Sequence, residues 1–228
     1  EPKGIRLDSG DLAYLSTRAR RMLAEAGYPD AIICASGDLD EYLITSLKNQ
    51  GAKIDLWGVG TKLITSADMP ALGGVYKLSA LYPKEGGEVP KIKLSDNSDK
   101  ITNPAFKDVY RIYDNATGKA EADLIVVRGE KIDTGKPLTV FHPKDTWKRT
   151  TFTDYSVRQL TVPVIKGGKL VYELPPLSDV CEYAEREKET FWDEYKRLDN
   201  PHVYKVDLSQ KLYDIKNKLI SEIRAENA

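Results

Sequence analysis

Residues 3–61, KGIRLDSGDLAYLSTRARRMLAEAGYPDAIICASGDLDEYLITSLKNQGAKIDLWGVGT, decide the fold. Three runs in this stretch have the composition of strands, and the two segments between them carry apolar residues at helical spacing. The expected strands are residues 3–8, 31–35 and 53–57, and the expected helices are residues 12–26 and 39–50. Each helix is followed by a glycine, Gly27 or Gly51, suited to the left-handed backbone that ends a helix. The alternation, repeating every ~25 residues, predicts an α/β fold with parallel strands, either an open sheet or part of a (β/α) barrel.

The pattern changes after this stretch. Residues 73–174 are rich in short strand-like runs, and we expect hairpin turns at Asn115–Gly118 and Gly167–Gly168. Apolar spacing predicts two closing helices over residues 179–198 and 209–225. We therefore divide the chain into residues 1–80, which hold the β/α units, and residues 81–228, which hold the β-rich segment and the last helices. Three β/α units do not close a barrel, so either the sheet is open or the rest of a barrel precedes Glu1.

Composition excludes several classes of protein. The 228 residues carry 34 Lys and Arg against 35 Asp and Glu, a net charge of −1, so neither a basic nucleic-acid footprint nor an acidic tail is expected. No apolar run approaches the ~18 residues of a membrane span. The first residues given are charged, so no secretory leader is expected. Two cysteines are too few for a disulfide scaffold or a four-cysteine zinc site, so we expect a reduced, cytoplasmic setting.

Similar short glycine-containing motifs follow the three expected strands. The tetrapeptide SGDL occurs twice, at residues 9–12 and 36–39, and the third strand is followed by GVGT at residues 58–61. In parallel β/α folds, ligands bind at the carboxyl ends of the strands. Glycines there allow close backbone approach, helix N-termini favour anions, and carboxylates can accept hydrogen bonds from a sugar diol. The pattern indicates a sugar-phosphate site.

Each of these residues also has a simpler interpretation. Asp11 and Asp38 each occupy a position where a helix N-cap is expected. Asp8 precedes the turn and is a poorer candidate for a cap, so we favour a functional role for it. The GVGT loop is either a phosphate cradle or a tight turn that needs a glycine with positive φ. Cys34 is expected to be a buried, inert thiol. We interpret three groups as ordinary core or surface residues: His142, His202 and the aromatic residues at 191–195. Three lysines could reach a phosphate, namely Lys62, Lys77 and Lys100.

Five segments resemble the nicotinate phosphoribosyltransferase family, in order and spacing. They are GIRLDSGDLAYLS (4–16), ASGDLDEY (35–42), GAKIDLWGVGTKLIT (51–65), PALGGVYKL (70–78) and KITNPAFKDVYR (100–111). The resemblance extends over essentially the whole chain, but the family's enzymes are about twice as long, so the chain resembles their C-terminal half.

The resemblance implies a fold and a reaction. The fold is an irregular (β/α) barrel of the type II phosphoribosyltransferase kind, with a second α/β domain formed from both ends of the chain and an active site near a homodimer interface. The reaction joins nicotinate to phosphoribosyl pyrophosphate, giving nicotinate mononucleotide and pyrophosphate for NAD salvage. ATP hydrolysis through a phosphohistidine drives the reaction and Mg²⁺ assists it. The phosphohistidine and the aromatic residues that sandwich the base belong to a missing N-terminal part, because neither histidine here matches.

The resemblance also assigns roles residue by residue. Arg6 faces the base and the pyrophosphate, whereas Asp8, Gly37 and Asp38 contact the ribose. Gly58, Gly60 and Thr61 form the 5′-phosphate cradle, and Lys77 and Lys100 contact phosphate or pyrophosphate. Asp8 and Asp38 are the expected catalytic residues, since carboxylates beside the ribose stabilise an oxocarbenium-like transition state.

Two kinds of alternative function remain. One is a phosphoribosyltransferase for nicotinamide or quinolinate, because the residues that select the base lie upstream. The other is a non-catalytic phosphate-binding module that retains GVGT without the histidine. No nucleic acid and no membrane is expected as a partner.

Overall fold

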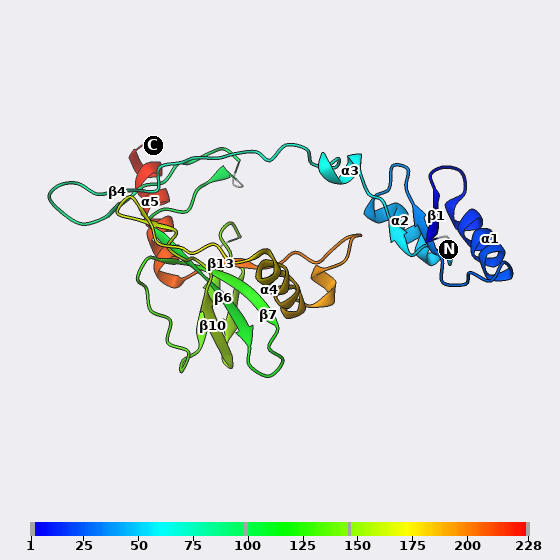
Figure 1. The fold of residues 1–228 in the computed structure, drawn as a ribbon. Helices are drawn as coiled ribbons and strands as arrows, with labels where there is room; N and C mark the ends of the chain where they lie inside the picture. Colours follow the sequence, from blue (N-terminus) through cyan, green and yellow to red (C-terminus); the bar gives the residue numbers. More distant parts are fainter. Residues whose placement is uncertain (1–2, 98–99, 146, 227–228) are drawn as a thin grey trace. The chain divides into compact units, whose positions relative to one another are not determined.

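The structure is a computed structural model that describes residues 3–97, 100–145 and 147–226. The chain forms two compact units, Glu1–Val75 and Tyr76–Ala228 (Figure 1). Both helices and strands occur in each unit, so the expected α/β class is confirmed. No helix among the described residues is long and apolar enough to cross a membrane.

The first unit contains a three-stranded parallel sheet with the order β1-β2-β3. Its elements are β1 (Gly4–Leu7), α1 (Leu12–Glu25), β2 (Ile32–Ala35), α2 (Glu41–Asn49), β3 (Leu56–Trp57) and α3 (Thr61–Ile64). The predicted alternation of strand and helix is therefore confirmed. Gly27 and Gly51 follow the first two helices with φ of +88° and +78°, as their position after a helix predicts.

The third strand is shorter than the expected 53–57. The side chain of Asp55 accepts a hydrogen bond from the backbone N–H of Ile33 at 2.7 Å, while the N–H of Asp55 donates to the carbonyl of Ile33 at 2.9 Å. A carboxylate thus takes the position of a backbone acceptor, and regular pairing begins only at Leu56. Arg20 fixes this carboxylate through an ion pair of 2.5 Å.

The two faces of this sheet differ in burial. Ile33 and Ala35 are fully buried, and Ala35 packs with Leu12, Leu39 and Leu47, so the helices cover their face. Side chains alternate along a strand, and Ile32 and Leu56, which lie on the other face, remain 46% and 55% exposed. Cys34 shares that second face and is only half-buried, so the expectation of a buried thiol was wrong.

The second unit is built on a six-stranded sheet with the order β10-β6-β7-β13-β8-β9. The strands are β6 (Lys107–Asp114), β7 (Ala120–Val127), β8 (Leu138–Phe141), β9 (Arg149–Phe152), β10 (Tyr155–Gln159) and β13 (Val206–Leu208). The last of these comes from near the end of the chain yet lies between β7, to which it is parallel, and β8. Helix α5 (Gln210–Glu226) follows it, and Leu212 of α5 is fully buried with Leu208 of β13.

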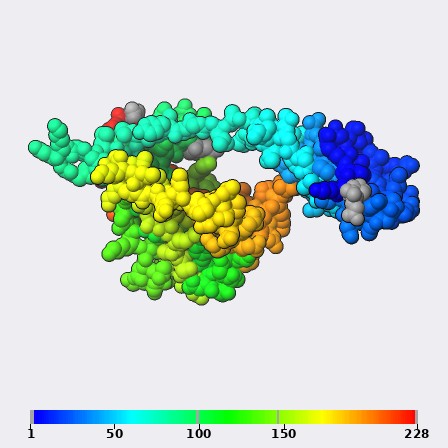
Figure 2. Space-filling view, viewed as in Figure 1, coloured from blue at the N-terminus to red at the C-terminus, as the bar shows by residue number. Residues whose placement is uncertain are grey.

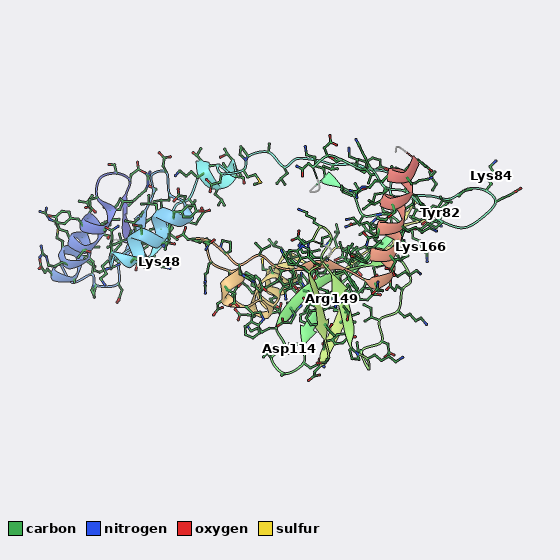
Figure 3. The ribbon with its side chains drawn as sticks, turned by 180° about the vertical axis from the view of Figure 1, so that it is seen from behind. Lys48, Tyr82, Lys84, Asp114, Arg149 and Lys166 are labelled. Atoms are coloured by element: carbon green, nitrogen blue, oxygen red, sulfur yellow. The ribbon has the colours of Figure 1, made fainter. Side chains whose placement is uncertain are left out.

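Both expected hairpin turns are present. Gly118 has φ of +69° in the β6–β7 turn and donates its N–H to the carbonyl of Asp114 at 2.8 Å; Asp114 is labelled at this turn in Figure 3. Gly167 and Gly168, both with positive φ, join the short strands β11 (Ile165–Lys166) and β12 (Lys169–Leu170). A further two-stranded pair is formed by β4 (Ala80–Leu81) and β5 (Val89–Pro90).

The helix expected over 179–198 is shorter and starts earlier. Helix α4 spans Leu177–Thr190, and a separate 3-10 turn covers Asp193–Tyr195. Phe191 has extended backbone angles, and its ring packs edge-on against Tyr204 at 5.1 Å and under the Arg111 guanidinium at 4.7 Å. These contacts draw the aromatic residues away from the helical path that their spacing predicted.

Candidate functional site

The carboxyl ends of β1, β2 and β3 lie side by side. Leu7 pairs with Ala35, and Ala35 pairs with Trp57, so the three strands end at the same edge. The two SGDL loops and the GVGT loop therefore leave the sheet together, as the sequence pattern indicated.

Arg6, Asp8 and Ser36 form a hydrogen-bonded cluster at this edge. Arg6 and Asp8 are two residues apart along β1 and its extension, and they share the sheet face that the helices leave open. The Arg6 guanidinium bonds to Asp8 Oδ1 at 2.6 Å and to Ser36 Oγ at 2.8 Å. The Ser36 hydroxyl also donates to Asp8 Oδ1, at 2.5 Å. One oxygen of the Asp8 carboxylate is therefore fixed in place, while the other makes no hydrogen bond with a described residue.

This cluster holds Asp8 in its charged form. The hydrogen bond from Ser36 lowers the pKa of Asp8 below its ordinary value, and the charge and hydrogen bond of Arg6 lower it further. Asp8 and Arg6 are 59% and 64% exposed. At neutral pH, the edge of the sheet thus presents an oriented, accessible carboxylate beside a guanidinium.

Gly37 is required by the packing of the two loops. Its φ is +102°, and a Cβ at this position would lie 2.5 Å from the carbonyl oxygen of Asp8. Any other residue would be strained in its own backbone and would push the Asp8 loop away. Gly37 therefore brings the Asp8 loop and the second SGDL loop into direct contact.

Asp38 is not the N-cap of α2, so that interpretation was wrong. The helix begins at Glu41, and Asp40 caps it by accepting the N–H of Leu43 at 2.7 Å. Leu39, 1% exposed, is held in the core, and the helix therefore begins two residues later than expected. Asp38 itself has φ of +47° and makes no hydrogen bond with a described residue, so its exposed carboxylate is available to a ligand. Asp11, by contrast, caps α1 through the N–H of Tyr14 at 2.9 Å, as expected.

The GVGT loop passes from β3 into the single-turn helix α3. Gly58 donates its N–H to the carbonyl of Ala35 at 2.8 Å, which fixes the start of the loop to β2. Gly60 precedes the helix with φ of −118°, so the alternative of a turn glycine with positive φ was wrong. A Cβ at Gly60 would meet no described atom within 4 Å. The N–H groups of residues 59–62 find no acceptor within the part of the chain that the structure describes.

Asp8, Gly37 and Asp38 line one hollow of about 460 Å³ between the first two loops and α2. A second, smaller hollow of about 160 Å³ lies between Asp40, Lys62 and the residues after α3. Lys62 forms an ion pair with Asp40. The hydrogen bond to Asp40 raises the pKa of Lys62, and the charges of Asp40, Asp38 and Asp68 raise it further. A cation thus stands beside the carboxylates of the second loop.

The structure brings together seven of the nine residues singled out from the sequence. Arg6, Asp8, Gly37, Asp38, Gly58, Gly60 and Thr61 all lie at the carboxyl edge of the first sheet or in the loops that leave it. Lys77 and Lys100 belong to the second unit, where both are exposed. The phosphate roles of these two lysines stay predictions.

Two contributors were missed in the sequence. Ser36 opens the second SGDL repeat, and its position directly after a strand, level with Asp8, could have indicated a bridge between the two loops. The pairing of Lys62 with Asp40 had no local signal, because the two residues are far apart in sequence. Among the described residues, no three His, Cys, Asp or Glu side chains gather to hold a metal ion.

Comparisons with known proteins show which family the chain resembles. Residues 106–216 match the model of the nicotinate phosphoribosyltransferase C-terminal domain. Across 97% of its length, the chain is 46% identical to a nicotinate phosphoribosyltransferase of Bacillus subtilis. The chain closely resembles the C-terminal part of nicotinate phosphoribosyltransferases. It is also 36% identical, over 95% of its length, to the nicotinate phosphoribosyltransferase of Dictyostelium discoideum.

The chain spans 45% of the Bacillus subtilis relative and 38% of the Dictyostelium discoideum relative. The fold is similar to that of the human nicotinic acid phosphoribosyltransferase in its crystal structure. The TM-score is 0.69 at 24% identity, covering 95% of this chain and 40% of the human one. This likeness supports the fold of both units within the family.

Proposed function

We propose that the protein containing this chain transfers a phosphoribosyl group from phosphoribosyl pyrophosphate to nicotinate. The products are nicotinate mononucleotide and pyrophosphate, and the reaction belongs to NAD salvage. The observation that carries the proposal is the meeting of three loops at one sheet edge, where an oriented carboxylate, an unpaired carboxylate and a glycine loop with free N–H groups lie together. The similarity of the chain to nicotinate phosphoribosyltransferases supports it.

The carboxylates would act on the ribose. Transfer at the anomeric carbon builds positive charge on the sugar ring, and a fixed anion beside the ring stabilises that charge. Asp8 is held by Arg6 and Ser36 and keeps one oxygen open. Asp38 does not cap α2, so it could accept a hydrogen bond from a ribose hydroxyl without giving up a bond to the helix. Arg6, on the same sheet face, would offset the charge of the departing pyrophosphate.

The GVGT loop would hold the 5′-phosphate. Backbone N–H groups at the start of a helix favour phosphate oxygens, and the free N–H groups of residues 59–62 provide four donors. The open space around the Gly60 Cα leaves room for an anion close to the backbone. In this proposal, Lys77 and Lys100 contribute further phosphate or pyrophosphate contacts.

Mg²⁺ and ATP complete the proposal. Mg²⁺ in phosphate chemistry uses one or two carboxylates together with substrate oxygens, and Asp8 and Asp38 line the same hollow, so this donor set fits it. When bound, Mg²⁺ would offset the charge of the pyrophosphate. ATP hydrolysis would pass through a histidine of the N-terminal part, to which neither His142 nor His202 corresponds.

The same proposal extends to the architecture. The uncovered sheet face with exposed Ile32 and Leu56 is what three strands cut from an irregular (β/α) barrel would show. Residues 162–174, yellow in Figure 2, lie on the surface of the second unit with exposed apolar side chains such as Ile165, Leu170 and Leu174. Such surfaces mark interfaces. We therefore propose that these surfaces are covered by a missing N-terminal part, which completes a second α/β domain, and by the second subunit of a homodimer. The proposed cytoplasmic location rests separately on the presence of only two cysteines.

Steady-state assays of the full-length protein test the function. Phosphoribosyl pyrophosphate is supplied with nicotinate, nicotinamide or quinolinate, with and without ATP and Mg²⁺. We expect kcat/KM to be largest for nicotinate and to rise with ATP. A preference for either other base would assign that base instead, and phosphate binding without turnover on any base would support the non-catalytic module.

A further inference from the structure

A small cavity in the second unit is lined by basic side chains. It lies beside α5, the red helix of Figure 3, and its volume is about 220 Å³. Lys144, Lys216 and Arg224 supply positive charge to the lining, and Asn217 and Tyr213 supply polar groups. No carboxylate lines it among the described residues. All of its lining residues belong to the second unit.

Lys216 is the unusual member of this group. The residue is only 5% exposed, yet it carries a charged headgroup. Its Nζ donates to Asn103 Oδ1 and to the carbonyl oxygen of Pro143, both at 2.8 Å, and both acceptors are neutral. An ammonium group has three N–H donors, so one donor remains for a ligand in the cavity.

Lys216 has no counter-charge within the described part of the chain. Burial, together with the smaller effect of the neighbouring positive charge of Lys144, lowers the pKa of Lys216 to about 8. Nearby acids are engaged elsewhere: Asp145 pairs with Lys148 at 2.6 Å, and Asp214 accepts from Gln210 at 2.8 Å. Buried charges in proteins are normally paired. The Lys216 amine lines a cavity with two further cations and has no anion from the described residues to balance its charge. The cavity therefore lacks the anion that a buried charge normally requires.

We propose that this cavity binds a small, multiply charged oxyanion of the phosphate class, with Lys216 donating its third N–H and Lys144 and Arg224 adding charge. The volume limits the choice of ligand, because pockets for drug-sized molecules measure roughly 300–1,000 Å³. Orthophosphate and pyrophosphate are the two sources of such an anion, and a nucleotide is too large. The site does not depend on the function proposed for the first unit.

The test follows the Lys216 amine directly by NMR in the full-length protein with ¹³C-labelled lysine. The pH titration of Lys216 is recorded with chloride alone, with orthophosphate and with pyrophosphate. An anion that binds the charged amine ten-fold more tightly raises its pKa by one unit, and we expect at least this shift. The anion giving the shift at lower concentration is the preferred ligand. An unchanged Lys216 titration at saturating concentrations of both anions would overturn the proposal.

Binding measurements on variants provide the second arm. Lys216→Met keeps the length of the side chain without its charge, and Lys218→Met changes an exposed lysine of the same helix, 76% exposed and paired with Glu222. Anion titrations are made in the Gly60→Val background, which is designed to block the phosphate loop proposed for the first unit. We expect Lys216→Met to weaken binding at least ten-fold and Lys218→Met to leave it unchanged. Equal affinity in both variants would refute the site.

Arg224→Met covers the case in which Lys216→Met does not fold. Arg224 is exposed and makes no ion pair with a described residue, so its loss should not disturb the core. Weaker anion binding in this variant supports the site, whereas unchanged binding together with an unshifted Lys216 titration removes it.

Discussion

Replacing Asp38 with asparagine separates a role in substrate binding from a role in the fold. The residue has φ of +47°, which asparagine adopts readily and alanine does not. Asp38→Asn therefore keeps the backbone and removes only the negative charge. Since Asp38 makes no hydrogen bond with a described residue and does not cap α2, the folded state should lose little stability.

The expected loss is in catalysis. A hydrogen bond to a charged group contributes about 1.5–3 kcal/mol, which corresponds to a fall of about 10- to 150-fold in kcat/KM. The measurement is kcat/KM for phosphoribosyl pyrophosphate in the full-length protein, together with thermal unfolding of the same preparation.

Asp40→Ala is the matched control, two residues along the same loop. It removes the observed cap of α2 and the ion pair of Asp40 with Lys62, but neither carboxylate proposed to contact the ribose, so about 1 kcal/mol of stability should be lost. That loss lowers Tm by about 2–4 °C in a domain of 150–250 residues, while kcat/KM stays near the wild-type value. Wild-type kcat/KM in Asp38→Asn would remove Asp38 from the site, and equal destabilisation of the two variants would show that its role is structural.

Four further outcomes follow from the same geometry. Gly60→Val should weaken binding of phosphoribosyl pyrophosphate and of nicotinate mononucleotide together, with little change for nicotinate, because the valine side chain would fill the space, empty of described atoms, in which the phosphate is proposed to lie; calorimetric titration checks this, and unchanged product affinity would exclude a phosphate there. Gly37→Ala should destabilise the protein by about 1–3 kcal/mol, since its φ is +102° and its Cβ would meet the Asp8 carbonyl; a wild-type denaturation midpoint would contradict the close packing of the loops. Ser36→Ala should move the acidic limb of the pH–activity profile to higher pH, because the hydrogen bond from Ser36 is the largest cause of the lowered pKa of Asp8; an unmoved limb would mean that Asp8 does not control it. The 228-residue chain alone should show no turnover and should copurify with a complementary N-terminal fragment; formation of nicotinate mononucleotide by the isolated chain would refute this.

The sign of the Ser36→Ala effect follows from the direction of the shift. Asp8 has a folded-state pKa below its ordinary value, so the carboxylate stays charged until the pH falls well into the acidic range. Removing the Ser36 hydroxyl raises this pKa toward the ordinary value, and protonation then begins at a higher pH. Activity that needs the carboxylate is lost earlier on acidification. Ser36→Thr, which retains the hydroxyl, should keep the limb near its wild-type position.

The sequence by itself determined the local features of this protein. The alternation of strand and helix over residues 3–61, the glycines after α1 and α2 and the two hairpin turns were all readable, because each depends on residues close together in the chain. The meeting of the two SGDL loops and the GVGT loop could be predicted for the same reason, since parallel strands end at a common edge.

Only the tertiary structure decided which side chains act together. The core position of Leu39 made Asp40 rather than Asp38 the cap of α2, and contact across two strands joined Ser36 to Arg6 and Asp8. In the second unit, β13 entered the middle of a sheet formed some eighty residues earlier in the chain. Packing of α5 buried the Lys216 amine against two neutral acceptors, with no counter-charge from the residues that the structure describes. Periodicity and turn chemistry are set by near neighbours in sequence, whereas burial, ion pairing and strand insertion are set by residues that folding alone brings into contact.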